Sequence, residues 1–157
     1  MTRVPRERLH RAKRKDTGEW VEGYYIHYRD MVHQIYACGI PTRRGESCSM
    51  FLDIDPATLG EFTSLRIKKG GKDSVKIFED DILKVVMETP NGKEIVECYV
   101  VEFVNGLFLA RKMNTNKIAG PVSNFAATKN FGGNSFVSCK IIGNIHDNPE
   151  LLRKANV

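Results

Sequence analysis

"KEIVECYVVEFVNGLFLARK", residues 93–112, is the stretch that decides the fold. Two segments rich in β-branched and aromatic residues flank Asn105-Gly106, a dipeptide that allows the positive φ angles of a tight two-residue turn. The stretch therefore predicts a β-hairpin, and similar segments and turns recur on both sides of it.

Upstream, the first half of the chain predicts two further hairpins. "RLHRAKRKDTGEWVEGYYIHY", residues 8–28, indicates two strands around Asp16-Thr17-Gly18. "DMVHQIYACGI" and "ESCSMFLDID" flank a second turn at residues 41–45. In "PATLGEFTSL", residues 56–65, Pro56 and Gly60 leave room for no more than one helical turn.

Three features complete the chain. "VKIFEDDILKVVMETP" supplies a strand after an acidic corner, and Asn91-Gly92 is a second two-residue hairpin signal. Residues 113–135 are polar and contain glycine, so we expect a long loop or a short irregular element. After a last strand, Gly143-Asn144 favours a bend, and Asp147-Asn148-Pro149 favours a helix start with Pro149 at the first helical position.

Many short strands joined by tight turns predict a mostly β, antiparallel fold. We expect a small barrel or curled sheet with N-terminal hairpins and a short C-terminal helical turn. A dinucleotide-binding fold is excluded, because no long helical segments alternate with the strands and no glycine-rich phosphate motif follows one. With 157 residues, 41% of them hydrophobic, residues 1–157 form a single domain in this interpretation.

The cysteines and the apolar runs limit the chemistry and the location. Four cysteines without a Cys-x-x-Cys pair indicate reduced thiols, and nothing demands a metal or another cofactor. No apolar run approaches the roughly 20 residues that cross a bilayer, and the basic start lacks the apolar stretch of a signal peptide. We therefore expect a cytoplasmic protein that has no membrane partner.

The formal charge of +5 is concentrated at the start of the chain. Residues 1–15 carry seven basic residues against Glu7 alone, a net charge of +6, so the remaining residues carry a net charge of −1. Such an edge favours phosphate-backbone binding that weakens with salt, although a charged run also serves solubility alone. Residues 1–8 are expected to form a flexible basic arm.

Four separated segments carry a resemblance to a known family. They are "RAKRKDTGEWVEGYYI", "IDPATLGEFTSL", "KIFEDDILKV" and "IIGNIHDNPELL". Their order and spacing resemble those of the YopX family, proteins found mainly in bacteriophages and prophages of Gram-positive hosts. The resemblance implies a mostly β protein with a small barrel related to SH3-like domains, in the cytoplasm of a bacterial host. It implies no established biochemical activity.

Two departures from the family pattern concern loops. Asp80 stands where the family usually has glycine in Glu-Gly-Asp, so an aspartate must supply any positive φ that this corner needs, at some strain. "RIKKGGKDSV", residues 66–75, is longer than the equivalent turn of the family, which predicts an extended loop.

A non-catalytic binding or assembly module is the favoured function. Basic residues would hold phosphates while exposed tyrosines stack on bases or fill a pocket of a host protein, although some of the tyrosines are expected in the core. Sheet edges also favour self-association into a homo-oligomer. The candidate residues for binding nucleic acid or another partner are Arg3, Arg6, Arg8, Arg11, Lys13, Arg14, Tyr24, Tyr25 and Tyr28, with Tyr36 on a neighbouring strand.

The alternative function is a metal-dependent enzyme that uses the acidic corner Glu79, Asp80 and Asp81. Consecutive residues of an extended chain point to alternate faces, however, so we expect a role in the turn instead. A zinc site built from His27, His33, Cys38 and Cys48 would have suitable ligand types but no tight ligand spacing. The residues assigned to structural turns are Gly18, Gly60, Asp80, Asp81, Gly143, Asn144 and Pro149.

Overall fold

The fold is that of a computed structural model, in which the chain divides into two compact units. Unit 1 runs up to Ser64, and unit 2 begins at Leu65. The structure describes residues 8–29, 32–41, 44–45, 47–69, 73–127, 130–131 and 133–154. Most of the predicted basic arm, including Arg3 and Arg6, lies outside the described residues, as does part of the turn predicted at residues 41–45.

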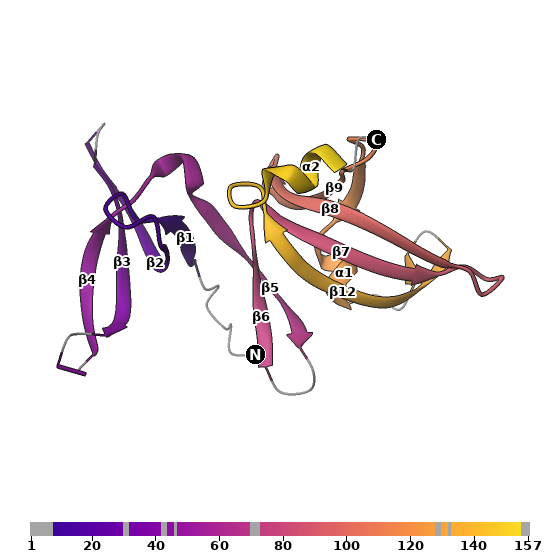
Figure 1. The fold of residues 1–157 in the computed structure, drawn as a ribbon, viewed down its shortest axis with the longest axis horizontal. Coiled ribbons are helices and arrows are strands. Elements are labelled where there is room, and N and C mark those ends of the chain that lie inside the picture. Colours follow the sequence, from indigo (N-terminus) through magenta and orange to yellow (C-terminus); the bar gives the residue numbers. More distant parts are fainter. Residues whose placement is uncertain are drawn as a thin grey trace. The chain divides into compact units, whose positions relative to one another are not determined.

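The chain is mostly β, as predicted, and its strands form two antiparallel sheets (Figure 1). The strands are β1 (His10–Lys13), β2 (Trp20–Tyr28), β3 (Val32–Pro41), β4 (Ser47–Asp53), β5 (Gly60–Lys69), β6 (Asp73–Phe78), β7 (Asp81–Glu88), β8 (Glu94–Val104), β9 (Leu107–Lys112), β10 (Ile118–Pro121), β11 (Asn130–Phe131) and β12 (Asn134–Asn144). The 3-10 helix η2 (Pro56–Thr58) and the helices α1 (Ser123–Ala127) and α2 (Pro149–Lys154) are short.

Unit 1 contains β1 to β4, η2 and the first half of β5. The first sheet has the order β4-β3-β2-β1-β5-β6, and β5 passes from unit 1 into unit 2 after Ser64, which has a φ of 66°. The end of β4 also meets the end of β1, because Arg14 and Ile54 form an isolated bridge. The single helical turn predicted at Pro56 is confirmed as η2, whose N-cap Asp55 accepts a hydrogen bond from the Ala57 amide.

The core of unit 1 lies on one face of its strands. Its buried members are Ala12, Ile35, Ala37, Leu52 and Ile54. They alternate with half-buried or exposed residues along β1, β3 and β4, which is the period-2 pattern of a sheet with one buried face.

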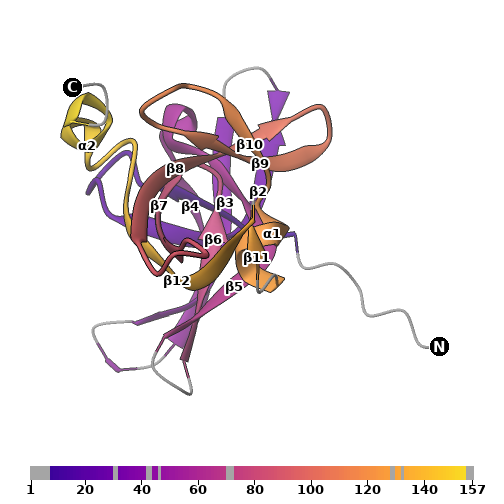
Figure 2. The same ribbon diagram turned by 90° about the vertical axis from the view of Figure 1, so that its right-hand side faces the viewer.

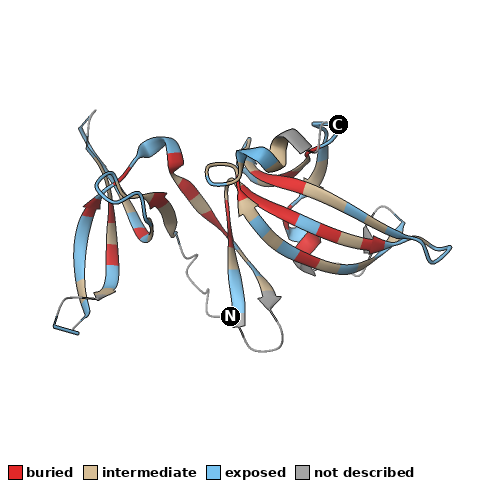
Figure 3. Cartoon of the chain, in the orientation of Figure 1, coloured by how far each residue is buried: buried red, intermediate tan, exposed pale blue. Residues whose placement is uncertain are grey.

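Unit 2 contains the rest of β5, then β6 and the second sheet. The order of that sheet is β10-β9-β8-β7-β12-β11, and Figure 2 shows β7, β8 and β12 strongly curved. Figure 3 shows the buried positions spaced along β7, β8 and β12. The larger core cluster of the unit comprises Ile77, Leu83, Val85, Met87, Tyr99, Val101, Ala110, Val122, Phe125 and Cys139.

All four cysteines are free thiols. Cys139 is buried, and burial raises the pKa of its thiol to about 12, so it packs as a small apolar group. Burial also raises the pKa of Cys98. Cys38, by contrast, is exposed.

The two Asn-Gly signals form different turns. Asn105 and Gly106 both have positive φ, 52° and 84°, and they join β8 to β9 as the predicted two-residue hairpin. At Gly92 the loop is wider than predicted. Strand β7 ends at Glu88 and β8 begins at Glu94, and the Thr89 amide donates to the carbonyl of Lys93.

The loop expected over residues 113–135 is more ordered than predicted. It contains β10, which pairs with β9, then the short α1 and β11. Neither β10 nor β11 has more than four residues, so their sequence pattern was too short to indicate strands. At the C-terminus the predicted helix start is confirmed, since α2 begins at Pro149. The bend predicted at Gly143-Asn144 is wrong, because both residues pair with β7 as the last two residues of β12, and the turn follows them.

Two expectations, a single domain and a small closed barrel, are not established by these units and strands. Two compact units can still fold as one, so a single domain over residues 1–157 stays a prediction. Each sheet has two edge strands in its hydrogen-bonded order, and no closed barrel is described.

Among the described residues, no helix has the length and apolar character needed to span a membrane.

Candidate functional site

The outer face of β2 carries two exposed aromatic side chains, Tyr24 and Tyr28. Tyr24 is 53% exposed and Tyr28 is 61% exposed, whereas Gly23, which precedes Tyr24, is buried. Successive strand residues point to opposite faces, so Trp20, Tyr24 and Tyr28 share one face and Tyr25 lies on the other. Of residues 23–26, Gly23 and Tyr25 therefore lie on the inner face, and Tyr24 and Ile26 lie on the outer face.

Pairing with β3 and β4 extends the outer face across three strands. Tyr24 lies opposite Tyr36, and Tyr36 lies opposite Phe51. The rings of Tyr36 and Phe51 are 5.0 Å apart between centroids, and Phe51 is 57% exposed. We call the set Trp20, Tyr24, Tyr28, Tyr36 and Phe51 the aromatic face.

Two cations border the aromatic face on β1. The guanidinium carbon of Arg11 is 5.0 Å and the ammonium nitrogen of Lys13 is 5.5 Å from the ring centroid of Trp20. Register places Lys13 opposite Trp20, and Arg11 opposite Glu22. The sequence-predicted Arg11 and Lys13 are therefore brought together with the outer tyrosines.

Arg14 does not join these cations on the face. Its guanidinium binds Asp16, with Nε 2.9 Å from Oδ1, and this hydrogen bond lowers the pKa of the Asp16 carboxyl. The surface beside Phe51 is hollowed, over a volume of about 370 Å³. Arg14, Lys15, Asp16, Gln34, Phe51, Leu52 and Asp53 line this hollow.

Tyr25 lies on the inner side, among histidines. Its hydroxyl is 2.6 Å from Nδ1 of His33, and its ring also contacts His10 and His27. The rings of His27 and His33 stack with their centroids 4.6 Å apart. His27 and His33 were considered together as zinc ligands, but their grouping with His10 and Tyr25 was not predicted, because it arises only through the pairing of β1, β2 and β3.

The remaining predicted binding residues are placed individually. Arg8 is exposed, at the first position that the structure describes.

Phe51 was missed by the sequence reasoning, because its place on the aromatic face depends on the register between β3 and β4. Within the described ranges, no three histidine, cysteine, aspartate or glutamate side chains are grouped to hold a metal ion. Of the zinc ligands considered above, His27 and His33 therefore meet without Cys38 and Cys48 completing a site.

The acidic corner separates its three carboxylates. Asp81 is 1% exposed, and its Oδ2 accepts a hydrogen bond of 2.8 Å from the amide of Phe78. Asp80 has a φ of 68°, and its Oδ2 lies 2.9 Å from Nε2 of His146. Glu79 accepts a longer bond, 3.4 Å, from the amide of Phe103. Each carboxylate thus contacts a different part of unit 2.

The turn after β12 is held by side-chain amides. Asn144 accepts hydrogen bonds from the amides of His146 and Asp147, both at 2.9 Å. A Cβ at Gly143 would lie 2.2 Å from Oδ1 of Asn148, so glycine is required for this packing. The amide of Ile145 also donates to the Asp80 carbonyl at 3.1 Å, which joins this turn to the acidic corner.

Gly18 has a φ of 72° in the first hairpin, as its assignment to a turn requires. Gly60 is placed at the first residue of β5, where it pairs with Arg11.

Comparison with known families covers both units. The sequence profile of the YopX protein family matches residues 9–153. The chain belongs to the YopX family. Comparison with curated proteins and with solved structures gives no match. All four segments that carry the YopX resemblance lie inside the matched range, and in unit 2 two of them meet through Asp80 and His146.

Proposed function

We propose that this YopX protein is a non-catalytic binding module and that the aromatic face binds single-stranded nucleic acid. One observation carries the proposal: Tyr24, Tyr36 and Phe51 form a row across three strands, bordered by Arg11 and Lys13. Tyr24 and Phe51 are exposed, and Tyr36 between them is half-buried. A host protein is the alternative partner for the same face.

The chemistry of the face suits unpaired bases. Stacking of a base on an exposed aromatic ring contributes about 1–3 kcal/mol and tolerates any base. The neighbouring cations would contact the phosphates, as would the basic residues that precede them. In a duplex the bases already stack on one another, so we expect single strands to bind more tightly than double strands.

Cross-strand aromatic pairs also stabilise sheets without binding anything. The basic start of the chain is what supports nucleic acid over a purely structural role, because seven cations lie within residues 1–15.

The test is fluorescence anisotropy with labelled single- and double-stranded oligonucleotides of the same sequence, at low and high salt. We expect salt-sensitive binding of the single strand in the micromolar range, weakened at least about ten-fold in the double variant Tyr24→Ala/Phe51→Ala. Phe103→Ala is the matched control, since it removes an aromatic ring of unit 2 that is 45% exposed. Deletion of residues 1–8 should also weaken binding.

Two outcomes would contradict the proposal. Equal affinity of the double variant and the native chain would show that the aromatic face is not the binding surface. Tight binding that is unaffected by deletion of residues 1–8 would remove the role of the arm.

We further propose that unit 1 is an SH3-like, partly open barrel. The strand order β4-β3-β2-β1-β5, the 3-10 helix η2 between β4 and β5, and the bridge between Arg14 and Ile54 support it. The amide of Asp55 donates to Lys13 across this bridge at 2.8 Å. Amide hydrogen exchange should therefore show protection at Asp55, and fast exchange there would contradict the closure.

Self-assembly is a second candidate, favoured by β4. This edge strand carries no charged residue from Ser47 to Leu52 and exposes Met50 and Phe51, so it lacks the charges that usually protect an edge. Light scattering should report a homo-oligomer, which Met50→Lys should dissociate into monomers. A monomer at all concentrations would exclude this mode.

Membership of the YopX family suggests a phage-type protein, and we propose that it acts in the cytoplasm of a bacterial host.

The alternative function is a metal-dependent enzyme that uses the acidic corner. The three carboxylates of that corner each contact a different residue, Phe78, Phe103 and His146. A hydrolytic or nuclease activity that is lost in Asp81→Ala but retained in Glu79→Ala would revive it.

A further inference from the structure

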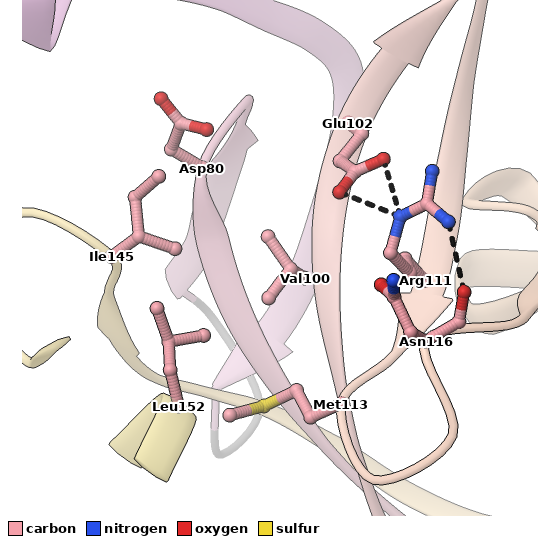
Figure 4. Close-up of a pocket in the computed structure, with 8 residues that line it drawn as sticks. All are labelled: Asp80, Val100, Glu102, Arg111, Met113, Asn116, Ile145 and Leu152. Carbon is pink, nitrogen blue, oxygen red and sulfur yellow. Dashed lines mark hydrogen bonds and ion pairs between the residues drawn. The ribbon is translucent and has the colours of Figure 1, made fainter. Parts of the chain in front are cut away.

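Unit 2 has a surface hollow of about 460 Å³ (Figure 4). This volume lies in the range of pockets that hold small organic molecules. The lining residues come from the acidic corner, β8, β9, the turn between β9 and β10, the turn after β12, and α2. They are Asp80, Val100, Glu102, Arg111, Met113, Asn116, Ile145 and Leu152.

The floor of the hollow is apolar. Val100 and Met113 belong to the smaller core cluster of unit 2, and Ile145 and Leu152 pack against that cluster. Figure 4 shows Val100 in the middle, with Ile145 and Leu152 on one side of it. An aliphatic chain lying there would be removed from water without displacing a polar group.

Two carboxylates flank this floor. Figure 4 shows Val100 between Asp80 and Glu102, with Arg111 beyond Glu102. The charge of Arg111 is matched, since its Nε lies 2.8 Å from both carboxylate oxygens of Glu102 and its Nη1 donates to the Asn116 carbonyl at 2.9 Å.

Asp80 supplies the excess negative charge. Its Oδ2 bonds to Nε2 of His146, and no described residue bonds to its other oxygen. Among the residues that line the hollow, two are carboxylates, Asp80 and Glu102, and one is a cation, Arg111. An anion would meet repulsion here, whereas a cation would find an acceptor beside an apolar floor.

We propose that this hollow binds an alkylammonium group, that is, a primary ammonium on an unbranched aliphatic stem. The ammonium lies at Asp80, beside the Glu102–Arg111 pair, and the stem lies on Val100, Met113, Ile145 and Leu152. Both a free aliphatic amine and the lysine side chain of a partner protein have this chemistry.

The test is a titration of the full chain with n-hexylammonium, followed by amide chemical shifts in NMR spectra. n-Hexanol and n-hexanoate serve as ligands of the same length with no charge and with a negative charge. We expect n-hexylammonium to bind at least ten-fold more tightly than n-hexanol, with hexanoate weakest. The shifts should centre on Val100, Met113, Ile145 and Leu152. Shortening the stem to n-butylammonium should weaken binding up to about four-fold for each methylene removed.

Two variants separate the charge from the floor. Asp80→Asn should remove the preference for the ammonium over the alcohol, and asparagine tolerates the positive φ of this position. Leu152→Ala should weaken both ligands alike and keep the preference. Glu150→Gln, which removes an exposed carboxylate of α2 outside the hollow, should change neither.

Equal binding of n-hexanol and n-hexylammonium, tighter binding of hexanoate, or shifts centred elsewhere would each overturn the proposal. The peptide acetyl-Gly-Lys-Gly-amide distinguishes the two sources. Tighter binding of the peptide than of n-hexylammonium would indicate a partner protein, and weaker binding would indicate a free amine.

Discussion

Gly23 is fixed by a close approach of neighbouring backbone. A Cβ at this position would lie 2.2 Å from the carbonyl oxygen of Tyr36 and 2.7 Å from Cγ2 of Ile35. The carbonyl belongs to the paired strand β3 and cannot move without breaking the ladder. We predict that Gly23→Ala lowers the free energy of unfolding by about 2–3 kcal/mol, measured by urea denaturation followed by circular dichroism.

Gly18→Ala is the control for Gly23. Nothing lies within 4 Å of its added Cβ, so its cost comes from the φ of 72° alone, about 1–2 kcal/mol. Gly18→Asn should cost less, because asparagine tolerates this backbone region. A larger loss for Gly18→Ala than for Gly23→Ala would show that crowding at Gly23 is relieved by the sheet.

His10 makes the stability of unit 1 depend on pH. Burial lowers its pKa below the ordinary 6.5, against a smaller raising effect of Glu61, and its buried Nδ1 has no hydrogen-bond partner in the described structure. Between the folded and the unfolded pKa, the unfolded chain binds more protons. Stability therefore rises with pH and is lost as the pH falls below about 6.5.

The measurement is the free energy of unfolding of the native chain and of His10→Gln over the pH range from 7 to 5. We expect a smaller loss in the variant. Both chains keep His27 and His33, so the difference isolates His10. Parallel losses in the two chains would contradict this assignment.

At the scale of elements, the corner between β6 and β7 depends on Asp81. Its buried carboxylate accepts the amide of Phe78, and Asp81→Ala would leave that donor without its acceptor. We predict a loss of about 1–3 kcal/mol in the free energy of unfolding. Asp81→Asn, which retains an acceptor oxygen, should lose less.

Glu79→Ala is the matched control for Asp81, because its bond to the Phe103 amide is long. Its effect should be the smallest of the three variants in the same urea experiment. An effect of Glu79→Ala as large as that of Asp81→Ala would show that the corner is held by charge rather than by the buried hydrogen bond.

Hairpins and caps could be predicted because their causes are local. Asn105-Gly106 supplies two positive φ angles, and Pro149 starts α2 because its missing amide costs nothing at that position. Strand β10 could not be predicted, because four residues carry no usable period. The aromatic face was predicted only in part. Tyr24 and Tyr28 are local to one strand, whereas Phe51 joins them through a register that the sequence does not reveal.

At the scale of the whole molecule, β5 contributes residues to both compact units. Unfolding of either unit would remove the partners of part of this strand. We therefore predict one cooperative thermal transition, with equal calorimetric and van't Hoff enthalpies. Gly23→Ala in unit 1 and Leu83→Ala in unit 2 should lower the same transition temperature. Two transitions, each sensitive to one variant, would instead establish two independent domains.

The cation contacts at Trp20 have a practical consequence. The chain has a single tryptophan, which lies in unit 1, and the charged groups of Arg11 and Lys13 both lie over its ring. Intrinsic indole emission therefore reports on one unit without a dye. A nucleobase that displaced either cation from the ring would change the intensity and wavelength of that emission, whereas an amine bound in unit 2 would leave it unaltered.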